Sequence, residues 1–137
     1  MKCAWVRDCS VALVWYSAWQ MECCGQPFSV NDRVEWNLTE EPEVDWIEAA
    51  VGVDLAVQVT HQEDHHELDG NAVARKGRVR SIRCAYSRYA PGPGGDGLYP
   101  LQGTAEIRPA ERVDGTEDVH RDLRFNGYLV ELDLELN

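Results

Sequence analysis

The chain has 137 residues, of which 44% are hydrophobic and 27% are charged. This length favours a single domain, and the composition is that of a folded protein rather than a disordered one. The 13 Lys and Arg residues and the 24 Asp and Glu residues give a net charge of −11. Because this charge opposes contact with nucleic acid or with an anionic membrane, we expect neither among the partners.

The N-terminal residues and the cysteines indicate the cellular compartment of the protein. Arg7 and Asp8 interrupt any apolar core of a signal peptide, and the longest apolar run, residues 11–16, has six residues. A membrane-spanning helix needs about 20 apolar residues. The five cysteines are an odd number with two of them adjacent, which is unlike a secreted disulfide framework. We predict a reduced, cytoplasmic protein, with residues 1–10 as an extension and residues 11–137 as one domain.

The first part of the chain has two strand patterns around an irregular segment. Residues 11–16 are an unbroken run of apolar, β-forming residues that is too short for a helix. Residues 17–28 follow neither period and end in Gly and Pro, so we predict an ordered loop with large side chains. After a turn at Asn31 and Asp32, residues 33–38 alternate apolar and polar, which predicts a half-buried strand.

One helix is predicted, over residues 43–52. Pro42 suits a first helical turn, and Gly52 can end the helix. Three apolar residues fall on one helix face: Val44, Ile47 and Val51. Residues 55–60 fit either a helix or a strand, with the strand preferred for their two valines, and the polar residues 61–71 are predicted to be a loop.

The later part of the chain is more plainly β. Residues 77–86 predict a strand with a bulge near Ser81, because the apolar residues before and after it are out of step. Residues 91–97 are predicted to be a loop, residues 98–107 contain a short strand, and residues 128–136 alternate as a strand.

These elements predict a mainly β fold. Five or six short strands with long irregular connections favour a small, partly open β-barrel, SH3-like or OB-like, with one α-helix inserted near 43–52. The core is expected to contain the side chains of Val34, Trp36, Ile82, Leu132 and Leu134.

Residues 92–97 match the G-x-G-x-x-G pattern of dinucleotide-binding proteins, but their context is wrong. Pro93 removes one of the backbone donors that would hold a pyrophosphate, and residues 98–100 cannot open a helix. We predict a surface loop here. Catalytic motifs are equally weak: no G-x-S-x-G elbow is present, and with 24 carboxylates any acid–base pair is uninformative. No catalytic residue is assigned.

Cysteines and histidines provide one metal-binding hypothesis. Thiolates and imidazoles bind zinc, and six of them could collect around one ion: Cys23, Cys24, His61, His65, His66 and Cys84. The paired C-x₂₋₄-C spacing of structural zinc sites is absent, and adjacent cysteines in an extended chain point to opposite sides. Buried thiols that pack as small hydrophobic groups are the commoner outcome. We therefore expect no cofactor, with zinc as the alternative.

Charge is unevenly distributed along the chain. Residues 40–69 contain ten acidic residues and no Lys or Arg, whereas residues 77–89 contain four arginines and no acidic residue. Either the two segments neutralise each other, or the arginine strand forms a face that binds an anion or a peptide. Trp19, in the irregular segment, either pins that loop down or lines a pocket. The candidate binding residues are Trp19, Phe28, Arg78, Arg80, Arg83, Tyr86, Arg88 and Tyr89.

Several short motifs carry a resemblance to a known family. Residues 19–28, Trp-Gln-Met-x-Cys-Cys-Gly-x-Pro-Phe, followed by Asp32-x-Val34-x-Trp36, resemble the opening of a small domain-of-unknown-function family found in actinobacteria. Further similar pieces are His65-His66, Gly77-x-Val79-x-x-Ile82, Tyr89-Ala90-Pro91, Tyr99-Pro100 and Phe125-x-Gly127-Tyr128-Leu129-Val130. The resemblance covers residue 14 to the C-terminus, and Asn31 stands where members have Gly. It implies one intact domain in a bacterial, cytoplasmic protein, and it supplies no activity.

Taken together, the residues favour a non-enzymatic binding or accessory module for a protein segment or a small ligand. The alternative is a zinc-binding or thiol-dependent protein that uses the six cysteine and histidine residues named above. A small enzyme whose site no motif reveals is the third hypothesis, and the sequence assigns it no residue.

Overall fold

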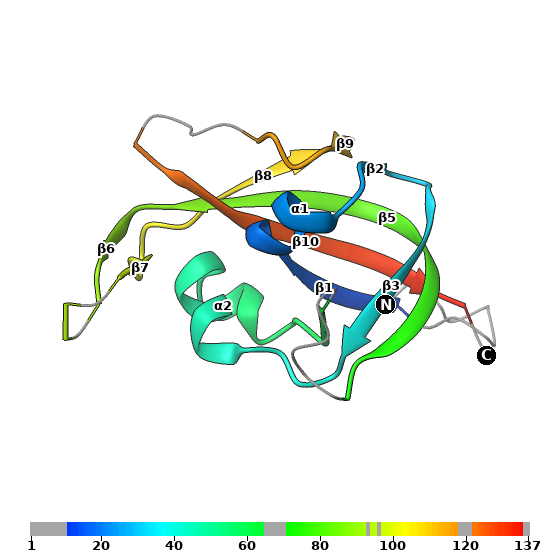
Figure 1. Cartoon of the computed structure of the whole chain (residues 1–137), viewed down its shortest axis with the longest axis horizontal. Helices are drawn as coiled ribbons and strands as arrows, with labels where there is room; N and C mark the ends of the chain where they lie inside the picture. Colours follow the sequence, from blue (N-terminus) through cyan, green and yellow to red (C-terminus); the bar gives the residue numbers. More distant parts are fainter. Residues whose placement is uncertain (1–10, 65–70, 93, 96, 118–121, 136–137) are drawn as a thin grey trace.

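The computed structural model describes residues 11–64, 71–92, 94–95, 97–117 and 122–135, and for Cys23 and Cys24 the backbone alone. Its strands are β1 (Val11–Ser17), β2 (Phe28–Ser29), β3 (Arg33–Thr39), β4 (His61–Glu63), β5 (Val73–Ser87), β6 (Tyr89–Pro91), β7 (Leu98–Pro100), β8 (Glu106–Ala110), β9 (Arg112–Val113) and β10 (Arg124–Leu134). Its helices are α1 (Ala18–Cys24), α2 (Val44–Val51) and α3 (Val53–Ala56) (Figure 1). The expected extension, residues 1–10, lies outside the described residues.

Five strands form a closed barrel. The long strand β10 pairs with β1 on one side and with β5 on the other, and β5 pairs in turn with β3. The short strand β4 completes the ring between β3 and β1, and β8 adds a sixth strand beside β5. The predicted small β-barrel is therefore confirmed. The ring is closed rather than partly open, but β4 is registered with each neighbour at only two residue pairs.

The alternation of side chains along β1 separates two hydrophobic clusters. Val14 and Tyr16 point into the barrel, where they join the inward side chains of β5 and β10. Leu13 and Trp15 point out of the barrel and pack against α2 and α3. The predicted helix at 43–52 is confirmed as α2, which covers this outer side of β1 and β10 (Figure 1).

The expected core residues all belong to the inner cluster. Ile82, Leu132 and Leu134 are buried, whereas Val34 and Trp36 are half-buried and pack against them. Burial is incomplete at Val34 and Trp36 because this part of β3 lies beside a surface cleft. The predicted bulge near Ser81 is also confirmed, since Arg80 is the extra residue between two registered pairs of β5 and β10.

Glycine is required where β10 passes closest to the other strands. A Cβ atom at Gly127 would lie 2.5 Å from the main-chain oxygen of Tyr16, and Gly127 has a φ of 154°. A Cβ atom at Gly77 would lie 2.7 Å from the main-chain oxygen of Asp133. These distances are below any normal contact, so the strands approach this closely only because both positions lack side chains.

A bulge in β10 leaves Asn126 between the pairs formed by Phe125 and Gly127. The Asn126 side chain is 3% exposed, and its Nδ2 donates to Ser87 Oγ at 2.9 Å and to the Ala50 carbonyl at 3.4 Å. Its Oδ1 accepts a hydrogen bond from the Tyr89 hydroxyl. One buried amide thus connects β10 with α2, the end of β5 and β6.

Two segments differ from the prediction. Residues 17–28 were expected to be a loop but contain α1 and β2. Helix α1 has no side-chain cap, and it is anchored instead by the burial of Gln20 and Met21, which local sequence does not reveal. Residues 55–60, where a strand was preferred, contain the end of α3 and a turn. The strand β4 instead begins at His61, within the expected loop. The sequence does not reveal it, because the residue that this strand buries is Glu63 rather than an apolar one.

The approach of β10 to β1 leads to a stability prediction. Gly127→Ala forces a methyl group against the Tyr16 carbonyl, so we expect the free energy of unfolding to fall by about 1–3 kcal/mol. The measurement is urea unfolding followed by circular dichroism. An unchanged transition midpoint would show that β10 and β1 do not meet this closely.

Candidate functional site

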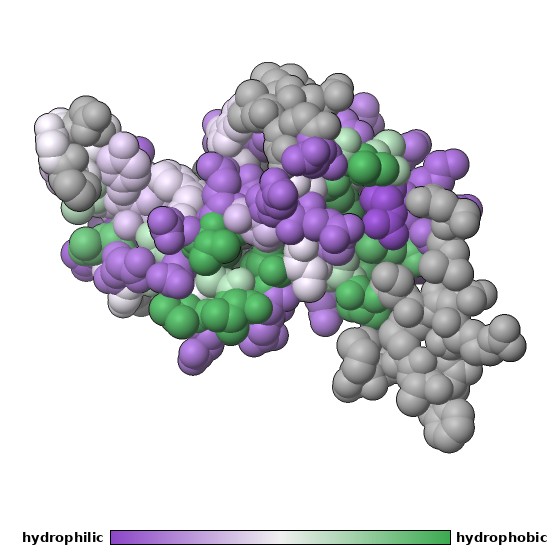
Figure 2. Space-filling view, turned by 90° about the horizontal axis from the view of Figure 1, so that it is seen from below, coloured by the Kyte–Doolittle hydropathy of each residue, from purple (hydrophilic) through white to green (hydrophobic). Residues whose placement is uncertain are grey.

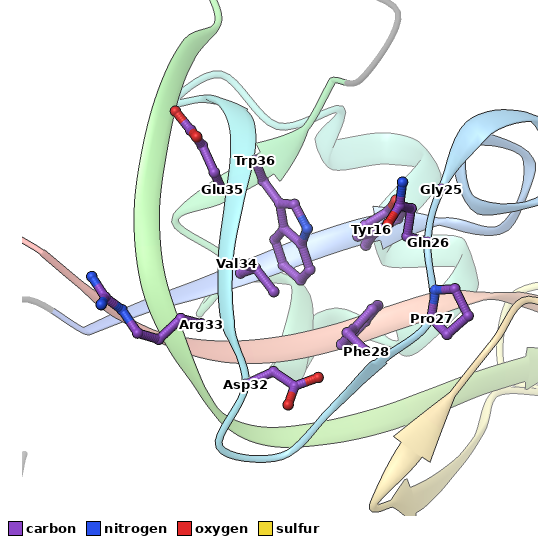
Figure 3. Close-up of a pocket in the computed structure, with 10 residues that line it drawn as sticks. All are labelled: Tyr16, Gly25, Gln26, Pro27, Phe28, Asp32, Arg33, Val34, Glu35 and Trp36. Atoms are coloured by element: carbon purple, nitrogen blue, oxygen red, sulfur yellow. The ribbon is translucent and has the colours of Figure 1, made fainter.

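Three aromatic side chains from different parts of the chain meet at one end of the barrel. Tyr16 comes from β1, Phe28 from β2 and Trp36 from β3 (Figure 3). The Trp36 ring centroid lies 5.0 Å from that of Tyr16 and 5.0 Å from that of Phe28, in edge-to-face arrangements. Such pairs are favourable beyond their buried area, so the three rings form a firm surface.

These rings form the floor of a cleft. One wall is the chain from Gly25 to Pro27, and the other is the beginning of β3 with the residue before it, Asp32 (Figure 3). The cleft has a volume of about 350 Å³. Ligand pockets run from about 300 to 1,000 Å³, so this is enough for a small ligand or for a side chain of a bound segment. We call it the aromatic cleft, with the lining residues Tyr16, Gly25, Gln26, Pro27, Phe28, Asp32, Arg33, Val34, Glu35 and Trp36.

The β3 wall is a strand edge. Within the described residues, the half of β3 from Arg33 to Trp36 is paired with β5 alone, because β4 reaches only Leu38 and Thr39. The Asn37 carbonyl accepts a hydrogen bond from the Asp64 N–H at 2.8 Å, so it faces away from β5. Main-chain groups two residues apart face the same way in a strand. The N–H and C=O groups of Glu35 and Arg33 therefore face the aromatic cleft.

Two charged residues at the rim of the aromatic cleft, Asp32 and Arg33, contact other residues of the same chain. Asp32 Oδ2 accepts a hydrogen bond from the Ser29 N–H at 2.9 Å, within a turn whose Asn31 has a φ of 80°. Arg33 forms an ion pair with Glu135, and its Nε donates to Oε2 at 2.9 Å. Intramolecular contacts thus occupy Asp32 and Arg33.

Burial shifts the pKa of two groups, Tyr16 and His61. Desolvation, followed by the nearby carboxylate of Glu63, raises the pKa of Tyr16 well above its ordinary value. The Tyr16 hydroxyl is therefore neutral, and the Tyr16 side chain is 2% exposed. The pKa of His61 is lowered, mainly by desolvation and also by Arg75, although Glu40 acts in the opposite direction.

The predicted binding residues do not form one face. Phe28 lies in the floor of the aromatic cleft, but Trp19 is 49% exposed and lines a separate hollow with Gln20 and Asp64. Tyr86 is buried in the barrel, and Tyr89 is hydrogen-bonded to Asn126.

The predicted arginines are held along β5 and beyond it. Arg78 donates to the Asn31 carbonyl at 2.7 Å, and Arg83 is half-buried. Arg80 lies 3.5 Å from Asp133, and Arg88 lies 2.9 Å from Asp122. The acidic partners of Arg80 and Arg88 therefore come from the C-terminal part of the chain and not from residues 40–69.

The predicted metal ligands are only partly described. The Cys23 and Cys24 side chains and residues His65 and His66 lie outside the described part of the chain. Cys84 is buried in β5, where desolvation, followed by the charge of Glu117, raises its pKa to about 12. His61 lies on β4, a strand that does not pair with β5. Among the described residues, no three His, Cys, Asp or Glu side chains are grouped to hold a metal ion.

Tyr16 and Trp36 are not among the binding residues that were predicted from the sequence. Alternation placed Trp36 on the buried face of its predicted strand, whereas Tyr16 ends an unbroken apolar run that distinguishes no face. The missing information was the short reach of β4, which leaves the gap between the two strands.

The fold and the cleft define a small β-barrel with an aromatic cleft beside an open strand edge. The chain belongs to a family of unknown function, DUF6578, whose match covers residues 10–134. This finding agrees with the resemblance to a domain-of-unknown-function family. No curated protein and no solved structure matches the chain. In the described part of the chain, no helix is long and apolar enough to cross a membrane.

The lowered pKa of His61 predicts a pH dependence of stability. The folded chain binds this proton less readily than the unfolded chain, so the contribution of His61 is complete above its ordinary pKa of about 6.5 and is lost as the pH falls through the lower, folded pKa. We expect the wild type to lose stability relative to His61→Gln across this range. Urea unfolding at several pH values measures the difference, and an NMR titration midpoint for His61 above about 6.5 would contradict the prediction.

Proposed function

We propose that the protein is a non-enzymatic binding module that takes up an extended segment of another protein in the aromatic cleft. The observation that carries the proposal is that the half of β3 that, among the described residues, is paired only with β5 lies directly beside three packed aromatic rings. The added segment pairs with β3 through the main-chain groups of Glu35 and Arg33. This mode of binding is strand addition to a sheet edge.

Strand addition gives the segment a defined chemistry. Main-chain hydrogen bonds contribute affinity without regard to sequence, and the side-chain pocket contributes specificity. Because side chains alternate along a strand, every second residue of the segment faces the floor formed by Phe28 and Trp36. An apolar or aromatic residue at that position buries the largest area, and the neutral Tyr16 hydroxyl provides one hydrogen bond beside it.

The chemistry of the lining supports binding over catalysis. A general base needs a pKa near the working pH, whereas that of Tyr16 is raised far above its ordinary value. Asp32 and Arg33 are engaged by Ser29 and Glu135 of the same chain. The cleft volume, at the small end of ligand pockets, fits a side chain of a peptide better than a large cofactor.

Two substitutions at Glu35 separate the contribution of its main-chain N–H to peptide affinity from the contribution of its side chain. Glu35→Pro removes the N–H that faces the cleft and leaves the ladder with β5 intact, whereas Glu35→Ala keeps that N–H. We expect peptides selected on the wild type from a displayed random library to bind Glu35→Ala unchanged. They should bind Glu35→Pro about tenfold more weakly, which corresponds to one lost hydrogen bond. Fluorescence polarisation measures both affinities.

Two further measurements complete this test. Thermal unfolding shows that both variants are folded, and amide hydrogen exchange of the wild type shows whether Glu35 becomes protected when peptide is added. Equal affinity for the proline and alanine variants would reject strand addition. A library that yields no binder, while a small ligand protects the same amide, would favour the small-ligand version of the cleft.

One observation supports zinc or thiol chemistry as a second function. Trp19 and Gln20 of α1 line the same hollow as Gln62 and Asp64. The helix that carries Cys23 and Cys24 therefore lies beside the strand that precedes His65 and His66. Cys84 is not part of this arrangement, because it faces the barrel interior with a raised pKa.

Elemental analysis distinguishes the two functions. The binding-module proposal expects purified protein without stoichiometric zinc. The alternative expects close to one zinc per chain, lost together with thermal stability in Cys24→Ser and retained in the matched variant Cys84→Ser. Zinc that is retained in both variants would exclude Cys24 as a ligand.

A further inference from the structure

A second hollow lies on the other side of β1, between α2 and β7. Its volume is about 450 Å³, larger than that of the aromatic cleft. The Trp46 and Tyr99 rings, which both line it, contact each other edge to face, with centroids 6.1 Å apart and planes inclined by 67°. We call it the α2–β7 groove, with the lining residues Glu43, Val44, Asp45, Trp46, Ala49, Tyr99 and Pro100.

The groove is apolar and open to solvent. Val44 is 55% exposed and Tyr99 is 43% exposed, although both are large hydrophobic side chains. Figure 2 views the molecule from the side of α2, and on this face hydrophobic residues gather among hydrophilic ones. Exposed apolar surface of this kind, rimmed by polar groups, is typical of protein–protein contact sites.

The charged residues that line the groove, among those that the structure describes, are both acidic. Glu43 and Asp45 line it directly. Acidic residues are frequent in this stretch, and residues 40–69 contain no Lys or Arg. Aligned charges of one sign select a partner of the opposite sign and repel partners of the same sign.

We propose that the α2–β7 groove docks a basic, amphipathic segment of a partner protein, whose apolar side chains pack against the edge-to-face pair of Trp46 and Tyr99 and whose Lys or Arg residues meet Glu43 and Asp45. A second copy of this chain fits poorly, because it would place two acidic rims together in a molecule with a net charge of −11. The proposal is independent of peptide binding in the aromatic cleft, since it rests on a different cavity.

Three fluorescein-labelled peptides test the chemistry of the occupant. The first alternates Leu and Lys at amphipathic spacing, the second has Glu in place of Lys, and the third has Ser in place of Leu. We expect fluorescence polarisation to detect binding of the Leu–Lys peptide alone, with an affinity that falls as salt is added. Equal binding of the Leu–Glu peptide would overturn the charge argument, and equal binding of the Ser–Lys peptide would overturn the apolar one.

Matched variants locate the binding. We expect Tyr99→Ala to weaken the Leu–Lys peptide about tenfold, as for a central aromatic contact, while Leu101→Ala has no effect. Leu101 is equally exposed in the same region but does not line the groove. Asp45→Lys should weaken binding more than Asp54→Lys, although both acids lie in the first turn of a helix and both variants change the charge equally. Asp45 is a better position for the substitution than Glu43, because a change at Glu43 would also remove its side-chain hydrogen bond with Gln62.

Clear outcomes reject the proposal. Wild-type affinity in both Tyr99→Ala and Asp45→Lys would place the peptide elsewhere on the acidic surface. Sedimentation that shows dimers of the wild type and monomers of Tyr99→Ala would make a second copy the occupant. Thermal unfolding monitors the fold of each variant, and Asp45→Lys, a change at an exposed residue, keeps the test valid if Tyr99→Ala fails to fold.

Discussion

The ladder that β4 supplies between β1 and β3 closes the barrel, and it is only a few residues long. Because β4 is registered with each neighbour at two residue pairs, it joins the middle of β1, at Val14 and Trp15, to the end of β3, at Leu38 and Thr39. Beyond these pairs Tyr16 of β1 and the first half of β3 line the aromatic cleft, and the chain from Gly25 to Phe28 lies beside it (Figure 3). The aromatic cleft and the open edge of β3 are therefore consequences of the same short strand.

A single strand positions both proposed binding surfaces. The inward side of β1 contributes Tyr16 to the floor of the aromatic cleft. The outward side contributes Leu13 and Trp15 to the cluster that holds α2, and α2 forms one wall of the second groove. Because successive side chains of a strand point to opposite faces, the two surfaces lie on opposite sides of β1 and do not overlap.

Periodicity predicted those parts of the fold in which one side of an element is buried. The alternation in residues 33–38 matches β3, and the helical spacing of Ile47 and Val51 matches the buried face of α2, although Val44 is exposed. The pattern failed where tertiary contacts outweigh local preference. Helix α1 lacks a cap, and β4 presents Glu63 to the interior, so neither has an apolar period to detect.

The candidate sites were less predictable than the fold, because they depend on which distant residues meet. Of the predicted binding residues, Phe28 lies in the aromatic cleft and Trp19 lines another hollow, whereas the arginines are distributed along β5 and beyond it. The uneven acidic charge was visible in the sequence. Its position beside the half-buried Trp46 and the exposed Tyr99 depends on the β6–β7 hairpin reaching α2, which the sequence does not show.

The hydrogen bonds of the buried Asn126 amide limit the conformational entropy that the α2–β7 groove can lose when a partner binds. Through the Ala50 carbonyl, Asn126 holds α2, and through the Tyr89 hydroxyl it holds β6, the hairpin partner of β7. Both walls of the groove are thus fastened to one side chain before any partner arrives. A preformed groove loses little conformational freedom on association, so more of the contact energy is retained as affinity. The bulge in β10, which contains Asn126, therefore preorganises the α2–β7 groove, although no residue of β10 lines that groove.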